Sequence, residues 1–384
     1  MSKWKTVRLG DVFDLQMGKT PDRKNLDFFS TTDNKWISIA DISKADKYIF
    51  ETKEFISDEA VKKSGIKQIP ANTVIMSFKL SIGKTAITKG PMYSNEAIMA
   101  FLPNGKYEVD NDFLYHLFSN KDWSEGSNKA VKGITLNKAS LLEVKILLPP
   151  LTIQKQIAKT MDKCTEIISK NKRMLENYDT LIKSRFIEMF GDPILNSKGY
   201  NYKKLEELGK WESGGTPSRK NSDYFKGTIP WYSAGELNSL YLYDSNEKIT
   251  ENAIKESSAK LFRKGSLFVG MYDTAAFKMG IATSDCSSNQ ACANILPNKE
   301  VNVLWLYYIL LEMKEFFLQN RRGVRQKNLN LGMIKGFEIP YATIDLQNNF
   351  AAFVHQIDKS KFAVQKSLEK TEILYKSLMQ RYFA

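Results

Sequence analysis

Residues suited to redox, metal or covalent chemistry are scarce in this chain of 384 residues. Its three cysteines, Cys164, Cys286 and Cys292, are scattered and odd in number, which argues against a disulfide framework and suits a reducing cytosol. The two histidines, His116 and His355, lie far apart, so a Cys/His pair or a His-rich metal site is poorly supplied. No apolar run approaches the roughly 18 residues of a membrane span, and the first residues lack the apolar stretch of a signal peptide. We therefore expect a cytoplasmic protein without a metal centre.

Several nucleotide-binding and catalytic motifs are also missing. No GxGxxG occurs, which leaves a Rossmann fold without support. Gly18-Lys19-Thr20 and Gly83-Lys84-Thr85 look like the end of a P-loop, but Phe13 and Phe78 stand where that loop needs its first glycine. The adenine methyltransferase motif, Asn or Asp before Pro-Pro and an aromatic residue, is absent, because Pro149-Pro150 lies between leucines. These absences argue against nucleotide hydrolysis and methyl transfer by this chain.

What the sequence does contain is positive charge and enough apolar residues for folded cores. Lysine and arginine number 56 against 43 acidic residues, a formal charge of +13, and 42% of the residues are hydrophobic. That apolar fraction excludes a disordered chain, and the length predicts two or three domains. The excess positive charge indicates a polyanionic partner, either nucleic acid or an anionic membrane.

The sequence repeats itself along its length. GKTPDRKN at Gly18–Asn25 returns as GGTPSRKN at Gly214–Asn221, with six of eight positions identical. Further matches follow in the same order, such as Asn95-Glu96-Ala97 with Asn289-Gln290-Ala291. An ordered series of this kind indicates a tandem duplication of a unit of about 190 residues.

Each copy consists of a globular part followed by a long helical part. The globular parts are rich in aromatic residues and in short apolar runs punctuated by Gly, Pro and Asn, which predicts mixed α/β domains. The parts that follow lack Pro and Gly for some forty residues, which predicts two long helices. We expect a first domain at residues 1–150, a central helix at 151–191, a second domain at 192–341 and a distal helix at 342–384.

A heptad repeat in both long helices predicts that they pair with each other. Five heptads with an apolar seam are typical of one long helix packed on another, and an ordinary core helix is the simpler alternative. The expected fold is therefore α+β, with two mixed α/β domains joined by an antiparallel coiled coil and related by an approximate two-fold axis. The residues expected to pair the helices are Ile157, Met161, Ile168, Leu175, Ile182, Ile357, Val364, Leu368 and Leu378.

The repeated loop G-x-T-P-x-R-K-N is the first candidate for a DNA contact. Glycine permits close backbone approach, Thr-Pro builds a turn, and the Arg-Lys pair with the following Asn suits phosphate and base-edge contacts. A basic surface turn, with the Asn capping the next element, is an equally good interpretation from one copy, and the duplication favours function. The candidates in this loop are Lys19, Thr20, Arg23, Lys24 and Asn25, with Thr216, Arg219, Lys220 and Asn221 in the second copy.

A second basic segment precedes each long helix, at Asn128–Lys138 and at Asn320–Asn328. A solvated charge run is the usual interpretation, but on so basic a chain we expect DNA contacts by Arg321, Arg322, Arg325 and Lys327. Between these landmarks the copies diverge, as two readers of different sequences would require, although drift of loops would look the same. From these divergent segments we add Lys79, Lys84 and Tyr272 as candidates.

Taken together, these segments resemble the specificity subunit of type I restriction–modification systems. The resemblance spans the chain and rests on LGDVFDLQMGKTP, GGTPSRKN, IPWYSAGEL, SNQACANILP and LPPLTIQKQIA, although the distal helix opens with IPYATIDLQNNFA instead. It implies two target recognition domains, each reading one half of a split DNA site, and no catalysis by this chain. It also implies two partner modification subunits that bind S-adenosylmethionine and methylate adenine, joined in some systems by restriction subunits. S-adenosylmethionine, ATP and Mg²⁺ would then be bound by those partners.

Three alternatives remain open at this stage. A metal-dependent DNA nuclease could use Asp22 with Glu51 and Lys53, but Ser218 replaces Asp22 in the second copy. A specificity module of a related restriction system would share the fold with different partners. A coiled-coil adaptor that binds proteins only would show unspecific, salt-insensitive DNA binding.

Overall fold

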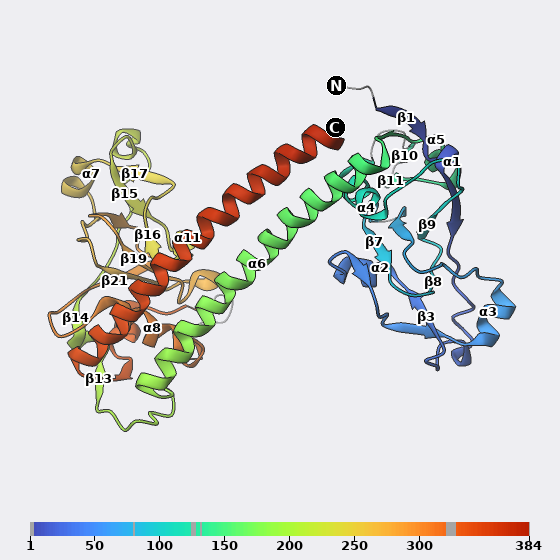
Figure 1. The fold of residues 1–384 in the computed structure, drawn as a ribbon. Coiled ribbons are helices and arrows are strands. Elements are labelled where there is room, and N and C mark those ends of the chain that lie inside the picture. Colours follow the sequence, from blue (N-terminus) through green and yellow to red (C-terminus); the bar gives the residue numbers. More distant parts are fainter. Residues whose placement is uncertain (1–3, 80, 124–127, 131–132, 320–327, 384) are drawn as a thin grey trace. The chain divides into compact units, whose positions relative to one another are not determined.

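The computed structural model describes residues 4–79, 81–123, 128–130, 133–319 and 328–383. These residues form two compact units (Figure 1). Unit 1 comprises residues up to 172 together with those from 366 onwards, and unit 2 comprises residues 173–365. The unit boundaries lie inside the two long helices, so each unit holds one globular domain and a portion of both helices.

Unit 1 is built around a five-stranded sheet. Its order is β2-β9-β6-β7-β4, and a three-stranded sheet of order β5-β3-β8, the pair β1-β12 and the pair β10-β11 complete the strands. The strands are β1 (Lys5–Arg8), β2 (Phe13–Met17), β3 (Asn34–Ile37), β4 (Tyr48–Ile49), β5 (Glu54–Ile56), β6 (Val74–Ser77), β7 (Thr85–Thr88), β8 (Tyr93–Ser94), β9 (Ile98–Pro103), β10 (Asn128–Ala130), β11 (Gly133–Thr135) and β12 (Lys145–Leu148). The short helices are α1 (Leu9–Val12), η1 (Leu26–Phe28), α2 (Ile39–Lys44), α3 (Asp58–Ser64), α4 (Asn111–Asn120) and α5 (Lys138–Glu143).

Unit 2 repeats both sheets of unit 1 and its terminal strand pair, and its described residues contain no counterpart of the β10-β11 hairpin. Its five-stranded sheet has the order β14-β21-β18-β19-β16, beside the sheet β17-β15-β20 and the pair β13-β22. The strands are β13 (Tyr202–Lys204), β14 (Gly209–Ser213), β15 (Ile229–Tyr232), β16 (Tyr241–Leu242), β17 (Glu247–Ile249), β18 (Leu267–Gly270), β19 (Met279–Ala282), β20 (Ser287–Ser288), β21 (Cys292–Pro297) and β22 (Glu338–Pro340). The short helices are η2 (Leu205–Leu208), η3 (Ser222–Phe225), η4 (Ala234–Glu236), α7 (Glu251–Glu256), η5 (Asp273–Ala275), α8 (Val303–Glu312), α9 (Lys314–Leu318) and α10 (Leu331–Lys335). The predicted mixed α/β fold and internal duplication are confirmed.

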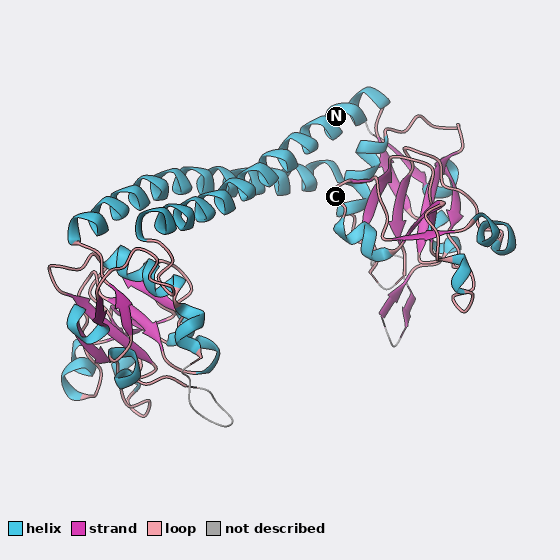
Figure 2. Ribbon diagram, turned by 90° about the horizontal axis from the view of Figure 1, so that it is seen from below, coloured by secondary structure: helices cyan, strands magenta, loops and turns pink. Residues whose placement is uncertain are grey.

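The central strands are buried on both faces, which is why they read as continuous apolar runs in the sequence. In β6, Val74 and Met76 face the cluster that also contains residues of α4 and α6, whereas Ile75 faces a second cluster with Ile37 and Ile42. In unit 1, α4 and the start of α6 therefore cover one face of the five-stranded sheet, and α2 with the smaller sheet covers the other. Figure 2 shows the strands of each unit with helices packed beside them. Both faces being covered leaves the strand ends and their loops as the exposed parts of each domain.

The two long helices are α6 (Leu151–Phe190) and α11 (Ile344–Phe383), each of 40 residues. Both lie within two residues of the bounds that the sequence predicts. Gly191, with φ 74°, ends α6 in the left-handed conformation that favours glycine. Among the described residues, no helix is both long and apolar enough to cross a membrane.

Within each unit the helix portions pack against each other and run antiparallel. In unit 1, Met161 shares a core cluster with Leu378, while the Asn171 side chain, later in α6, donates a 3.1 Å hydrogen bond to Ser367, earlier in α11. In unit 2, Phe190 at the end of α6 packs on Phe350 near the start of α11, with ring centroids 5.6 Å apart, while Asp179, earlier in α6, lies 2.5 Å from Lys361, later in α11. The antiparallel pairing expected from the heptads is therefore present in both units.

The predicted pairing residues all lie on the shielded side of their helices. Those that are buried are Ile157, Met161, Ile182 and Leu368, and those that are half-buried are Ile168, Leu175, Ile357, Val364 and Leu378. The end portions of the helices also enter the domain cores, since Ile157 belongs to the unit 1 core and Ile182 to that of unit 2.

A buried glutamine anchors the start of each long helix to its domain. The Gln154 side chain accepts a 2.8 Å bond from the Asp110 backbone N–H and donates to the Pro149 carbonyl. Gln347 repeats this arrangement with the backbones of Asn302 and Ala342. Because a buried amide is costly unless it is bonded, these contacts fix the helix to the loop before α4 or α8.

Candidate nucleic-acid interface

Three loops lie together at one end of the strands in each five-stranded sheet. In unit 1, Met17 of β2 pairs with Met99, which also pairs with Met76, and Met76 pairs in turn with Thr85. The segments 18–25, 78–84 and 95–97, of which residue 80 is not described, therefore leave the sheet at the same edge. The equivalent pairs in unit 2 bring together segments 214–221, 271–278 and 289–291. We call these two surfaces the loop edges of units 1 and 2.

The first glycine of the repeated loop is required by a close approach. A Cβ at Gly18 would overlap the carbonyl oxygens of Ser94 and Asn95, and one at Gly214 would overlap those of Ser288 and Asn289. The two repeated motifs of each copy, G-x-T-P and Asn-Glu/Gln-Ala, are thus packed against each other. This packing explains why both motifs persist in both copies.

Arg23 is held in unit 1 by a carboxylate and two aromatic rings. Its guanidinium donates to both carboxylate oxygens of Glu54, at 2.6 and 3.0 Å. It also lies 4.2 Å from the ring centroid of Phe29 and 4.7 Å from that of Trp36. The hydrogen bonds from Arg23 hold the pKa of Glu54 below its usual value. The Trp36 indole N–H donates to the Lys19 carbonyl at 3.2 Å, so the assembly also fixes the loop backbone.

Unit 2 contains the same arrangement of an arginine held by a carboxylate and two aromatic rings, and we call this arrangement the clamp of each unit. Arg219 makes a two-pronged ion pair with Glu247, one prong of 2.7 Å, and lies 4.3 Å from the Phe225 ring centroid and 5.3 Å from that of Trp231. The Trp231 indole donates to the Gly215 carbonyl at 3.0 Å. The persistence of the arginine in both copies therefore has an intramolecular cause. A contact between either arginine and DNA stays a prediction.

The asparagines of the repeated loop act as caps. The Asn25 side chain accepts from the Asp27 backbone N–H at 3.2 Å and opens η1, and Asn221 does the same for η3 through Asp223 at 3.1 Å. The capping interpretation is therefore confirmed for both residues.

The threonines of the two loops join the neighbouring segment. The Thr20 hydroxyl donates to Glu96, and the Thr216 hydroxyl donates to the side-chain carbonyl of Gln290. The hydrogen bond from Thr20 lowers the pKa of Glu96. The first copy thus carries an anion where the second carries a neutral amide, so the two loop edges differ in charge at an equivalent exposed position.

Lys24 and Lys220 are the loop residues best placed for an external anion. Both side chains are exposed, and neither forms an ion pair with any residue that the structure describes. Lys19, by contrast, donates to the Ser64 carbonyl. The duplicated clamp therefore presents one exposed lysine per unit at an equivalent place.

Three further candidates lie on the turns at 78–84 in unit 1 and 271–278 in unit 2. The Lys79 ammonium lies 5.3 Å from the Phe78 ring centroid, and Lys84 donates to the Ser43 hydroxyl at 2.6 Å. Tyr272, in unit 2, is 39% exposed. Sequence reasoning missed Lys278, which follows the unit 2 turn as Lys84 follows that of unit 1 and lies 3.5 Å from the Gly235 carbonyl. Aligning the two turns by the strands that follow them would have found it.

The second basic segments are described in part. The first contains the hairpin β10-β11 and the start of α5. Arg321, Arg322, Arg325 and Lys327 lie outside the described residues. The described residues that follow them adjoin the unit 2 loop edge, since Asn328 accepts from the Asp273 backbone N–H at 2.9 Å and the Leu329 N–H donates to the Met271 carbonyl at 2.8 Å.

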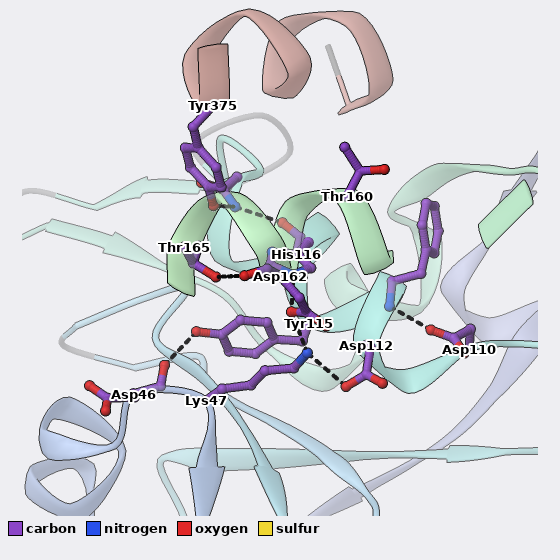
Figure 3. A network of polar contacts seen from close by, with 12 residues as sticks. Asp46, Lys47, Asp110, Asp112, Tyr115, His116, Thr160, Asp162, Thr165 and Tyr375 are labelled. Carbon is purple, nitrogen blue, oxygen red and sulfur yellow. Dashed lines mark hydrogen bonds and ion pairs between the residues drawn. The ribbon is translucent and has the colours of Figure 1, made fainter. Parts of the chain in front are cut away.

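A polar network ties the unit 1 domain to α6 (Figure 3). The Lys47 ammonium lies 2.8 Å from Asp112 and 2.6 Å from Asp162 of α6, and the buried His116 ring nitrogen lies 2.7 Å from the same Asp162 oxygen. Tyr48 donates to Asp112 at 2.8 Å. Burial raises the pKa of Asp162, but the hydrogen bonds from His116 and Lys47 outweigh it and keep the pKa below its usual value. No heptad or motif signals this network in the sequence, because its members come from three separate segments.

The three cysteines are buried, and two of the carboxylates considered for a nuclease are engaged by other groups. Burial raises the pKa of Cys286 and of Cys292 to about 12, which leaves both as thiols. Of the carboxylates considered for a nuclease, Glu51 pairs with Lys35 at 2.8 Å, and Asp22 accepts from the Lys24 backbone N–H. In the described part of the chain, no group of three or more acidic, His or Cys side chains is placed to hold a metal ion.

Known proteins are similar to this chain in sequence and in fold. The family described as the type I restriction modification DNA specificity domain matches residues 1–177 and again residues 197–374. The specificity subunit of the type I restriction enzyme MjaIX from Methanocaldococcus jannaschii is 30% identical over 190 residues, 48% of this chain and 43% of that protein. The specificity subunit of the Escherichia coli type I restriction enzyme EcoprrI is 22% identical over 369 residues, 91% of this chain and 86% of that protein. The crystal structure of the type I restriction–modification S subunit from M. genitalium matches with a TM-score of 0.63 and 15% identity, covering 99% of this chain and 96% of that one.

The whole-chain match to the M. genitalium structure shows that this chain has the fold of a type I S subunit. The two family matches coincide with the two copies of the duplication, and together they span nearly all of its residues. The chain belongs to the family of type I restriction modification DNA specificity domains. It spans less than half the length of the M. jannaschii relative.

Proposed function

We propose that this chain is the DNA-specificity subunit of a type I restriction–modification complex and that it reads a bipartite target without catalysing a reaction. Residues 1–150 and 192–341 are the two target recognition domains, and 151–191 and 342–384 are the conserved helices. Each domain reads one half-site through its loop edge. The observation that carries this proposal is the duplicated clamp, which presents Lys24 in one unit and Lys220 in the other beside loops that differ between the copies.

The loop edges combine what positioning and reading of DNA require. Exposed lysines suit sequence-independent phosphate contacts, which fix a protein on the duplex. Side chains that differ at equivalent positions, such as Glu96 and Gln290, suit base edges, where a carboxylate accepts from cytosine and an amide pairs with adenine. A rigid backbone under both keeps the ordering cost of binding low. Lys19, Thr20, Lys79, Lys84, Thr216 and Tyr272 share these edges and belong to the proposed contact surface.

The partners follow from the family. We propose that two modification subunits, which bind S-adenosylmethionine and methylate adenine, assemble on this chain in the cytoplasm, and that restriction subunits join where the system includes them. Cofactors are then bound by the partners.

The test is DNA binding by the purified chain across a range of salt concentrations, followed by reconstitution with its modification subunit. We expect binding whose logarithm falls steeply with the logarithm of salt, by about 0.9 for each phosphate neutralised. We expect adenine methylation of a split site only when both proteins are present. Cleavage of DNA by the chain with Mg²⁺ alone would support the nuclease alternative, and unspecific, salt-insensitive binding would support the protein-only adaptor.

A further inference from the structure

The turn between β18 and β19, at the unit 2 loop edge, has an unusual backbone. Asp273 and Phe277 both adopt positive φ angles, 46° and 57°, although neither is glycine. Residues held in this left-handed region cost about 1 kcal/mol or more, and they persist where the surroundings fix them. Asp tolerates the region better than most residues, but a bulky aromatic such as Phe does so rarely. The turn is therefore a specified shape that its surroundings maintain.

Several contacts impose that shape. The Phe277 N–H donates to the Gly270 carbonyl, and the Gly270 N–H to the Lys278 carbonyl, each at 2.8 Å, which closes the base of the turn. The buried Phe277 ring stacks on Phe317, with centroids 5.5 Å apart. The Asp273 backbone N–H is held by the Asn328 side chain at 2.9 Å. Both left-handed residues are thus fixed by contacts outside the turn itself.

The fixed turn presents Tyr272, Asp273 and Thr274 as exposed side chains. None of the described side chains pairs with the Asp273 carboxylate, whose backbone alone takes part in the contacts above. The equivalent turn of unit 1 is built differently, with Lys79, Lys84 and a glycine, Gly83, as its left-handed residue. The unit 1 turn therefore carries two lysines, whereas the unit 2 turn carries an acidic side chain, Asp273, together with Lys278.

An exposed carboxylate on a surface that binds DNA has a restricted use. Phosphates repel it, so it adds nothing to sequence-independent affinity. At a base edge, however, a carboxylate accepts a hydrogen bond from the exocyclic amino group of cytosine. A pre-formed turn lets it do so without an ordering cost. The anion therefore suits discrimination between bases and does not suit general attachment to DNA.

We propose that Asp273 is a specificity-determining residue whose carboxylate accepts a hydrogen bond from cytosine N4 in the major groove of the half-site read by unit 2. This proposal rests on the proposed function. It assigns a base contact to one residue, which DNA binding by the chain as a whole does not require. The competing explanation is that Asp273 serves only to form the turn, since Asp is favoured in left-handed positions.

The variant Asp273→Asn separates these explanations, because Asn is at least as suited to the left-handed region and has the same shape. The half-sites are first identified by methylome sequencing of cells that carry the chain with its modification subunit. The variant complex should then bind a duplex of that site about tenfold more weakly at fixed salt, with unchanged binding to a scrambled duplex. Its methylome should lose discrimination at one base pair of the unit 2 half-site only.

The matched control is Asp244→Asn, which alters an exposed acid of the same unit that pairs with Lys248 at 3.1 Å. It should leave the methylome unchanged. Unaltered affinity and methylome in Asp273→Asn would overturn the proposal. So would an equal loss of affinity for both duplexes with a lowered Tm, since that result indicates a turn-forming role alone. A wild-type complex without sequence-specific binding would overturn the proposed function as well.

Discussion

Replacing Arg219 and Lys220 by alanine one at a time separates the clamp from the DNA contact. The Arg219 and Glu247 side chains are 55% and 41% exposed, which limits their ion pair to at most about 1 kcal/mol. The guanidinium over Phe225 and Trp231 adds about 0.5–1 kcal/mol. Arg219→Ala should therefore cost about 1–2 kcal/mol of unfolding free energy and lower the Tm of unit 2 by roughly 5 °C.

Lys220→Ala should instead weaken DNA binding and leave the Tm nearly unchanged. Its exposed side chain has no ion pair among the described residues, so the Tm should stay within about 1 °C, as surface substitutions usually do. Loss of one phosphate contact should reduce the salt slope by about 0.9. The affinity deficit at 50 mM salt should then exceed that at 200 mM by about threefold. The assays are fluorescence anisotropy with a labelled duplex and a thermal melt.

Arg23→Ala is the internal control, because the same clamp holds Arg23 in unit 1. It should lower the Tm by a similar amount, and the salt slope should change by less than the 0.9 or so expected for loss of one phosphate contact. If Arg219→Ala instead reduces the slope as much as Lys220→Ala does and leaves the Tm unchanged, then Arg219 is a phosphate contact and the clamp reasoning is refuted.

Three further predictions concern the framework. Because the pKa of Asp162 is lowered in the folded state, its stabilising effect is present above about pH 4 and is lost as the pH falls below its usual value of 3.8. The Tm deficit of Asp162→Asn should accordingly be full at pH 7 and shrink toward pH 3, and a deficit independent of pH would contradict this. Asn171→Leu, which places an apolar side chain in an apolar seam, should raise the Tm by about 2–4 °C in a melt, whereas a lowered Tm would show that the hydrogen bond to α11 outweighs burial of leucine. Gly214→Ala should weaken DNA binding at least severalfold, since its Cβ overlaps backbone oxygens, while Gly235→Ala, whose nearest neighbour is 3.8 Å away, should bind normally.

The sequence predicts the architecture well because the duplication and the heptads are periodic signals. The 40-residue helices follow from long stretches without Pro or Gly, and the duplication predicts that both domains share one topology. These features are encoded locally or by repetition, which one sequence reveals.

Contacts between distant segments could not be predicted from the sequence. The Arg23–Glu54 pair joins residues whose spacing carries no signal, and without it Arg23 reads as a free cation. The network of Lys47, His116 and Asp162 similarly depends on α6 crossing the domain at one rotational position. The left-handed turn at Asp273 is set by Asn328, fifty-five residues away. Side-chain roles at the loop edges therefore needed the three-dimensional structure, although the loops themselves did not.

The most direct test of the two-reader account exchanges the segment from Tyr200 to Pro340 for that of a relative in the same family and sequences the methylome. That segment contains the whole loop edge of unit 2 and leaves the loop edge of unit 1 untouched. The account predicts that one half of the methylated site changes to that of the donor while the other half stays the same. A methylome in which both halves change, or neither does, would contradict it.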